Sequence, residues 1–313
     1  MKDFAARNPP ESAADPSLTV APNLEVASTG TGAESQQTFI SGELPPALAE
    51  LNLELPTAIG RYAVRRILGA GGFGTVYLCH DAQLDRLVAI KVLHSGRGGT
   101  PTETDRLLLE ARKLARLQHP GIVTVHDVGT HDAQLYIVAN YVDGQELAAW
   151  LTQNSPSWQD SALIVAAVGD ALAHAHAHLT VHRDVKPANI ILTTSLAPVL
   201  VDFGLALDEA SAGGRQLGRV AGTPAYMAPE QIAGTAHRID GRTDVYSLGV
   251  VLYEMLCRRL PFRATVIPEL LRQIRDDEPQ PPRQLAPQVP PELERICLKA
   301  AREEIAGPPC DRG

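Results

Sequence analysis

Two short polar segments of the sequence contain side chains that could carry out chemistry. The first, His182–Asn189, places basic side chains, an acid and an amide around a proline. Such groups are costly to bury in an apolar core, so we interpret the segment as a loop that presents them to a cleft. The second, Asp202–Gly204, follows the apolar run Val199–Val201. An aspartate that ends a strand beside a glycine is a candidate magnesium ligand.

A glycine-rich segment, Gly69–Gly74, fits the pattern G-x-G-x-x-G. A dinucleotide site with this pattern needs a helix after the loop, whereas the strand-forming residues Thr75–Tyr77 follow here. A P-loop would end in Gly-Lys-Ser/Thr, which is absent from the sequence at this point. The segment therefore predicts a hairpin whose turn lets backbone N–H groups approach a polyphosphate closely.

A lysine and a glutamate could complete a phosphate site. Lys91 ends the apolar run Val88–Ile90, and by itself it could simply mark the edge of a strand. Glu110 lies further along, inside an apolar stretch with helical spacing. An ion pair between Lys91 and Glu110 would hold the lysine over phosphate oxygens.

The elements that must position these residues fall into two groups. Periodicity and β-branched residues predict a strand-rich first part, followed by a mostly helical second part. The expected strands are residues 62–68, 75–80, 87–93, 122–128 and 135–142, and the expected helices are residues 103–117, 145–153, 160–179, 243–256 and 268–276. This order predicts an α+β chain of two lobes with a cleft between them.

The segment before these elements differs in composition. Residues 1–42 are acidic, rich in Ser, Thr and Pro, and poor in large apolar side chains, so we expect them to be disordered. Residues 43–60 contain leucines at helical spacing. We interpret them either as a linker or as a short helix that docks on the following domain.

Composition excludes several functions. The 313-residue chain has a net charge of −8 and a pI of about 5.7, so we expect no nucleic-acid partner. Its four cysteines form no disulfide or zinc pattern, which favours a reducing compartment. The N-terminus has no secretory h-region, and the sequence contains no apolar run long enough to span a membrane. We therefore expect a cytoplasmic protein.

Together these residues resemble the Hanks-type bacterial protein serine/threonine kinases. The resemblance runs from about Arg61 to about Lys299 and rests on motifs in the order and spacing of that family. The motifs are GAGGFGTV, VAIK, the Glu110 helix, YIVANYV, HRDVKPAN, DFG, GTPAYMAPE and DVYSLG. The resemblance implies a bilobal protein-kinase fold over residues 61–313, with an N-lobe of about 61–139 and a C-lobe of about 143–313.

The resemblance implies ATP and Mg²⁺ as ligands and proteins that bear Ser or Thr as substrates. Asp184 would be the catalytic base and Lys186 would sit by the γ-phosphate. Lys91 would bind the α- and β-phosphates and pair with Glu110, and the metal ligands would be Asn189 and Asp202. The residues implied to bind the nucleotide are Gly69, Ala70, Gly71, Gly72, Phe73, Gly74, Val76, Ala89, Lys91, Asn140, Val142 and Ile191.

The resemblance also assigns supporting roles. Asp244 would brace the catalytic loop by accepting backbone N–H bonds. His182, Phe203 and Leu114 would stack in the spine of the active state. A homodimer through the N-lobe is a further possibility that the family suggests.

Several positions depart from the family pattern. Ala139 stands at the gatekeeper position, where a larger residue such as Met is usual, and it would open a pocket behind adenine. Asn140 replaces a common Glu, with little consequence expected because the hinge contacts the nucleotide through backbone.

The activation and substrate loop has few hydroxyl groups. Between Asp202 and Glu230 only Ser211, Thr223 and Tyr226 carry a hydroxyl. We expect the loop either to be ordered without phosphorylation or to be switched through Ser211. Glu230, in the APE motif, normally pairs with a later arginine that neither Arg302 nor Arg312 clearly matches. The C-terminal end therefore looks truncated or frame-shifted, and a buried Glu230 with no partner would destabilise the C-lobe.

Two other functions remain open. One is a catalytically weak or inactive kinase-like regulatory module, because of the abrupt C-terminus. The other is a small-molecule phosphotransferase of related fold, which the GTPAYMAPE motif disfavours. The histidines His174, His176 and His178 could suggest a metal site, but no further ligand at suitable spacing completes it, and a structural use is expected.

Overall fold

The computed structural model describes residues 55–71, 74–94, 101–132, 134–203, 224–234 and 239–302. All of them lie in the second of two compact units, which comprises residues 36–313. The predicted disordered segment 1–42 falls outside the described residues.

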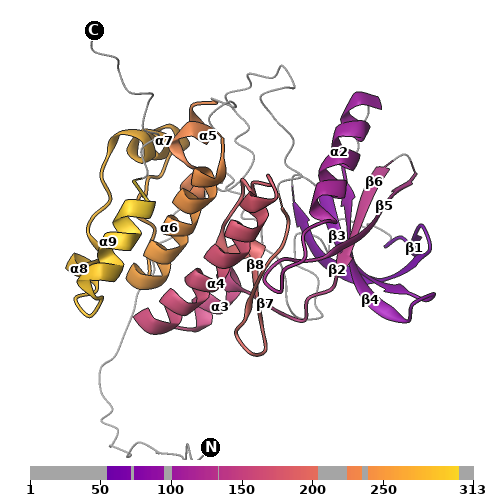
Figure 1. Ribbon diagram of the computed structural model, residues 1–313, viewed down its shortest axis with the longest axis horizontal. Coiled ribbons are helices and arrows are strands. Elements are labelled where there is room, and N and C mark those ends of the chain that lie inside the picture. The colour runs from indigo at the N-terminus through magenta and orange to yellow at the C-terminus, as the bar shows by residue number, and fades with distance from the viewer. Residues whose placement is uncertain are drawn as a thin grey trace, which may run out of the picture. The chain divides into compact units, whose positions relative to one another are not determined.

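The first part of the described chain is an antiparallel sheet of six strands with the order β1-β2-β3-β4-β6-β5. The strands are β1 (Ala58–Ile59), β2 (Tyr62–Gly71), β3 (Gly74–Asp81), β4 (Arg86–Leu93), β5 (Val125–His131) and β6 (Gln134–Asn140). Helix α2 (Pro101–Leu114) lies beside this sheet (Figure 1).

Strand β4 shows how one strand serves both a core and a site. Val88 and Ile90 are fully buried in the core of the sheet. Because side chains alternate between the two faces of a strand, Ala89 and Lys91 point to the opposite face, where they line a cleft. The strand therefore fixes Lys91 by burying its neighbours.

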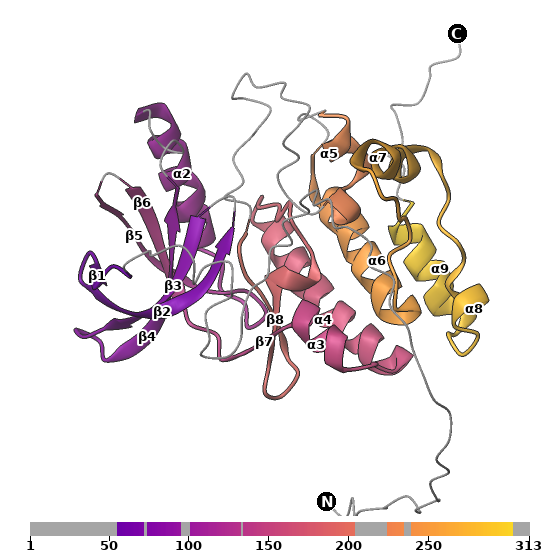
Figure 2. The ribbon, with the colours of Figure 1, turned by 180° about the vertical axis from the view of Figure 1, so that it is seen from behind.

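The second part is mainly helical (Figure 2). Its helices are α3 (Leu147–Gln153), α4 (Trp158–Ala177), α5 (Pro229–Ile232), α6 (Gly241–Cys257), α7 (Ile267–Asp276), α8 (Pro282–Leu285) and α9 (Pro291–Ala300). A small sheet of order β7-β8-β9 is formed by β7 (Gly144–Glu146), β8 (Ile190–Thr193) and β9 (Pro198–Leu200), and the 3₁₀ turns are η1 (Pro187–Asn189) and η2 (Pro224–Tyr226).

Helices α4 and α6 form the centre of this part, and local sequence explains where they begin. Ser157 and Asp160 form a capping box at the start of α4, with Ser157 Oγ accepting the Asp160 N–H at 3.1 Å. Asp240 caps α6 by accepting the Arg242 N–H at 2.9 Å. The two helices pack together around buried side chains such as Leu172 and Val251.

The predicted order of strands followed by helices is confirmed, with differences in detail. The expected helix 145–153 begins only at Leu147, because Gly144–Glu146 pair with β8. Ala58–Ile59 form strand β1, so the interpretation of 43–60 as a linker or a helix is wrong for these two residues. Their side-chain burial explains the difference, since Ile59 is only 1% exposed.

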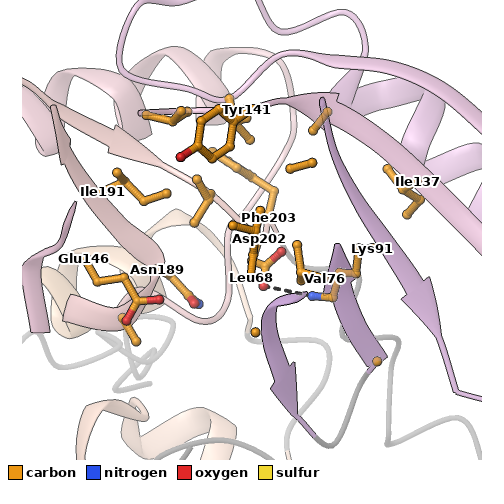
Figure 3. Close-up of a pocket in the computed structure, with 18 of the residues that line it drawn as sticks. Leu68, Val76, Lys91, Ile137, Tyr141, Glu146, Asn189, Ile191, Asp202 and Phe203 are labelled. Atoms are coloured by element: carbon orange, nitrogen blue, oxygen red, sulfur yellow. Dashed lines mark ion pairs between the residues drawn. The ribbon is translucent and has the colours of Figure 1, made fainter. Parts of the chain in front are cut away.

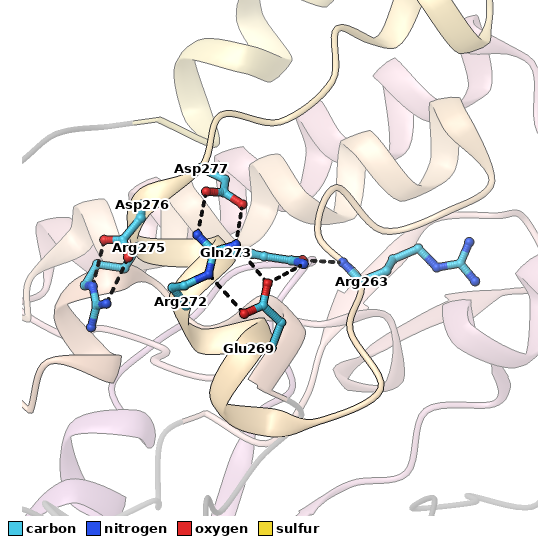
Figure 4. Close-up of polar contacts among 7 residues, drawn as sticks. All are labelled: Arg263, Glu269, Arg272, Gln273, Arg275, Asp276 and Asp277. Carbon is cyan, nitrogen blue, oxygen red and sulfur yellow. Dashed lines mark hydrogen bonds and ion pairs between the residues drawn. The ribbon is translucent and has the colours of Figure 1, made fainter.

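Helix α7 carries a polar network on its surface (Figure 4). Arg272 bonds the carboxylates of Glu269 and Asp277, and Arg275 pairs with Asp276. These side chains are all well exposed, so solvent screens their attraction and they contribute little to stability. Within the described ranges, no helix is long and apolar enough to cross a membrane.

Candidate active site

A cleft lies between the six-stranded sheet and the small sheet (Figure 3). Its walls come from the β2–β3 hairpin, β4, the segment after β6, and the loops around β8. Most of the predicted site residues line it: Gly69, Ala70, Gly71, Gly74, Val76, Ala89, Lys91, Asn140, Val142, Asp184, Lys186, Asn189, Ile191 and Asp202. Residues that are far apart in the sequence therefore meet in one cavity, as expected.

The glycine-rich segment forms the predicted hairpin. Gly69 pairs with Val76, and Gly71 pairs with Gly74, which leaves a two-residue connection outside the described residues. The predicted contacts of Gly72 and Phe73 fall in that connection. Gly74 has a φ of +157°, and a Cβ there would collide with the backbone oxygen of Val92. A glycine is thus required at position 74 for the hairpin to lie this close to β4.

Lys91 makes an ion pair across the cleft. Its Nζ lies 2.9 Å from Oδ2 of Asp202 (Figure 3). Burial acts to raise the pKa of Asp202, but the attraction of the Lys91 ammonium outweighs it and holds that pKa below its ordinary value. Asp202 has a left-handed φ of +59°, which is unusual for a residue with a side chain and is typical of functional positions.

Glu110 has a different environment. It lies on α2 and lines a smaller neighbouring cavity together with Leu114, Arg183 and Phe203. Its expected ion pair with Lys91 stays a prediction.

The residues of the predicted catalytic loop, Asp184, Lys186 and Asn189, are held by one another. Lys186 Nζ lies 2.9 Å from Oδ2 of Asp184. Asn189 Nδ2 donates to the backbone oxygen of Asp184 at 2.7 Å and to its Oδ2 at 2.9 Å. The 3₁₀ turn Pro187–Asn189 makes this possible, because it brings Asn189 back toward Asp184. The Asp184 carboxylate is therefore fixed in orientation at the cleft.

Asp244 holds the residues just before Asp184. Its fully buried carboxylate accepts the backbone N–H of His182 at 2.8 Å and that of Arg183 at 2.7 Å. This confirms the expected bracing role. His176 adds a contact that sequence reasoning missed, because its Nε2 lies 2.7 Å from Oδ2 of Asp244. This contact also gives His176 a structural use.

His182 links the loop to the segment that carries Asp202. Its Nδ1 accepts the N–H of Asp184 at 3.3 Å, so its Nε2 carries the proton donated to the backbone oxygen of Val201 at 3.0 Å. The ring packs on Phe203 with centroids 4.5 Å apart. The predicted packing of His182 on Phe203 is confirmed, and Leu114 belongs to the same core cluster.

Strand β6 carries two residues that depart from the family pattern, Ala139 and Asn140. Ala139 lines the cleft, in line with the prediction of a small residue at its back. The Asn140 side chain is turned away to His126, with Oδ1 2.7 Å from Nε2. His126 lies at a bulge between β5 and β6, where the register shifts between Val125 and Asp127. The side chain of residue 140 is therefore engaged by the neighbouring strand.

Glu230 has a partner within the helical part. It is 7% exposed, and its Oε1 accepts the Thr243 hydroxyl at 2.6 Å. The expectation that a buried Glu230 with no partner would destabilise the C-lobe therefore does not apply, because Thr243 is its partner. Arg302 instead lies 2.6 Å from Glu278. Ser211 and Thr223 fall outside the described residues.

Sequence reasoning missed several apolar residues of the cleft. They include Val201 and the residues Leu68, Ile137 and Tyr141, which line the cleft beside the predicted residues (Figure 3). For two of them, strand alternation could have indicated this position. Leu68 and Ile137 each lie two residues before Ala70 and Ala139, which were already assigned to the cleft, and residues two apart on a strand share a face. Among the described residues, no group of three or more His, Cys, Asp or Glu side chains is placed to hold a metal ion.

A strand-rich part and a helical part that enclose a glycine hairpin, a lysine–aspartate pair and a polar loop braced by a buried aspartate define the protein-kinase class. The chain belongs to the protein kinase family, whose domain model matches residues 62–302.

Its relatives include bacterial enzymes. The chain is 36% identical over 247 residues to the serine/threonine-protein kinase PrkC of Bacillus subtilis, covering 78% of this chain and 38% of PrkC. It is 40% identical over 248 residues to PknB of Mycolicibacterium smegmatis, covering 77% of this chain and 39% of PknB. The chain thus spans about two fifths of the length of these relatives.

A solved structure supports the fold. The kinase domain of Mycobacterium tuberculosis PknI aligns with a TM-score of 0.63 at 29% identity. The alignment covers 80% of this chain and 92% of that domain.

Proposed function

We propose that this chain is a protein serine/threonine kinase that transfers the γ-phosphate of ATP to Ser or Thr hydroxyl groups of proteins. The observation that carries the proposal is the Asp184 carboxylate, which is fixed by Lys186 and Asn189 at the edge of a cleft that also holds Lys91 and Asp202. A hydroxyl placed there would meet a proton acceptor, and a phosphate would meet two ammonium groups.

Each residue would have one task. Asp184 would orient the substrate hydroxyl and accept its proton. Lys186, next to Asp184, would neutralise charge on the transferred phosphoryl group. Lys91 would bind the remaining phosphates. Because phosphoryl transfer needs little covalent help, positioning and charge neutralisation would supply most of the rate.

The residues present fit a magnesium ion held jointly with the nucleotide. Asn189 uses its Nδ2 on Asp184, so its Oδ1 is the atom that would face a cation. Asp202 supplies a carboxylate, and both are hard oxygen ligands of the kind that Mg²⁺ prefers. Two protein oxygens are too few for a complete shell, so phosphate oxygens and water would supply the rest. When bound, Mg²⁺ would neutralise phosphate charge.

The glycine hairpin and the hinge would hold the nucleotide. The backbone of Gly69–Gly71 lines the cleft and can approach a polyphosphate. Val76, Ala89 and Ile191 would enclose the base, while Asn140 and Val142 would bond it through backbone groups. Protein substrates, a cytoplasmic location and a homodimer through the strand-rich lobe are part of the same proposal.

The test is phosphate transfer by the purified chain. We would incubate it with Mg-ATP and a generic basic protein and map phosphosites by mass spectrometry, with Asp184→Asn alongside. New phosphoserine or phosphothreonine in the wild type alone is expected. A folded wild type that binds ATP but transfers nothing would instead favour a regulatory module.

A further inference from the structure

Gln231, on the short helix α5, connects two segments through one side chain. Its Nε2 donates to the backbone oxygen of Arg183 at 2.7 Å. Its Oε1 accepts the backbone N–H of Ala228 at 2.9 Å. The orientation of the amide is therefore determined, because a flipped amide would place oxygen against oxygen and N–H against N–H.

The carbonyl that Gln231 binds belongs to the peptide bond between Arg183 and Asp184. Arg183 has a left-handed φ of +66°, which a residue with a side chain adopts only when its surroundings hold it there. Asp244 accepts its N–H at 2.7 Å, and Gln231 donates to its carbonyl. Two side chains from different helices thus hold both sides of this residue.

The helix that carries Gln231 is itself firmly attached to α6. Ser247 Oγ donates to the backbone oxygen of Tyr226 at 2.8 Å, and Tyr226 donates to Glu254 at 2.6 Å. Thr243 donates to Glu230 at 2.6 Å. The described segment 224–232 therefore provides a fixed base from which Gln231 reaches the catalytic loop (Figure 2).

We propose that Gln231 is a positioning residue for the reaction: it sets the peptide plane before Asp184 and couples the place of segment 224–232 to the direction of the Asp184 carboxylate. This inference rests on the proposed kinase function. It predicts that losing the Gln231 donor slows the transfer step while leaving nucleotide binding intact, because Gln231 lies outside the residues that line the cleft.

The experiment compares three variants. Gln231→Glu keeps the acceptor for Ala228 but places an oxygen against the carbonyl of Arg183. Gln231→Met keeps a similar length and removes both bonds. Gln284→Glu, at an exposed position of α8, is the matched control for the added charge. The readouts are the single-turnover rate of phosphate transfer, the affinity for Mg-ADP by calorimetry, and the thermal midpoint.

We expect the transfer rate of Gln231→Glu to fall about tenfold or more, and that of Gln231→Met to fall less. Mg-ADP affinity should stay within about twofold of wild type. The thermal midpoint should fall by only a few degrees, because the lost bonds to Ala228 and Arg183 are part-buried, so both variants stay folded under the assay conditions. A Gln231→Glu protein that transfers phosphate at the wild-type rate overturns the assignment. So does one whose affinity for Mg-ADP falls by the same factor as its transfer rate. A wild type that transfers no phosphate overturns the proposed function, and this assignment with it.

Discussion

The Asp244 carboxylate lies 2.7 Å from the backbone nitrogen of Arg183, so a buried side chain of α6 fixes the residue immediately before Asp184. The same carboxylate accepts the N–H of His182 and contacts His176. A loop held by such interior bonds does not need to be ordered by its substrate. The proposed base is therefore preorganised by the helical part, far along the sequence from the loop itself.

Replacing Asp244 with Ala should cost about 3 kcal/mol of unfolding free energy, because two buried backbone N–H groups would lose their acceptor. Asp244→Asn keeps one acceptor oxygen and should cost less. Urea unfolding followed by circular dichroism measures both. An Ala variant as stable as wild type would show that the loop is held by other contacts.

Lys91→Met should abolish most phosphate transfer, because the cleft loses the ammonium that faces Asp202. Lys299→Met, on the exposed face of α9, is the matched control and should retain activity. Single-turnover transfer from Mg-ATP is the measurement. Equal rates for the two variants would remove Lys91 from the proposed machinery.

The same variant should change how stability depends on pH. In the wild type the pKa of Asp202 is lowered, so its contribution is present above the ordinary aspartate value of about 3.9 and is lost as pH falls through the folded value. Without Lys91, the largest cause of that lowering is removed, so the Asp202 carboxylate contributes less stability above this value. The stability difference between wild type and Lys91→Met should therefore be constant above about pH 5 and shrink as pH falls below about 4. A difference in urea unfolding that does not shrink would contradict this.

The motifs allowed the fold and most of the cleft to be predicted, because their residue types and order suffice to identify the family. The ionic partner of Lys91 was harder to predict, because the ion pair with Asp202 depends on how closely the sheet approaches the loop that carries Asp202. Local sequence does not encode that distance. In the small sheet, the apolar run Val199–Val201 indicated β9, whereas β7 and β8 were missed because strands of three or four residues are too short for periodicity to be read.

Contacts between helices could not be predicted from the sequence either. Gln231 and His176 carry no pattern of their own, and each matters only because a distant residue lies opposite it. Asp244 could be assigned through family resemblance, yet its third contact could not. Charge and periodicity predict which face a residue occupies, whereas hydrogen-bond partners arise from packing.

Ala139 leads to a prediction about inhibitors. It lines the cleft together with Leu114, Ile137 and Phe203, so a larger side chain at position 139 would fill space at the back of the cleft. Bulky adenine-mimicking inhibitors should be at least about tenfold more potent on wild type than on Ala139→Met, because the added side chain would overlap with them. Competition assays with a small and a bulky inhibitor separate this effect from a general loss of binding. Equal potency of the bulky compound on both proteins would contradict the prediction that Ala139 leaves room for it.

Tyr226 and Glu254 provide a pH-dependent test of how segment 224–232 is anchored. Burial raises the pKa of Glu254, and the Tyr226 hydroxyl, which donates to it at 2.6 Å, partly offsets that rise. Tyr226→Phe removes this donor to a buried carboxylate and should destabilise the protein by about 2 kcal/mol at pH 8.

The sign of the pH effect follows from that raised pKa. A carboxyl group with a folded pKa above its unfolded value gains stability as pH falls and loses it as pH rises through the folded value. Tyr226→Phe raises the folded pKa further, so its cost should be larger at pH 8 than at pH 5. Tyr253→Phe is the control, because the Tyr253 hydroxyl donates to a backbone oxygen, that of Gln280, at 2.8 Å and should show a pH-independent cost. If urea unfolding gives the same pH dependence for both variants, Glu254 is not the group that Tyr226 stabilises.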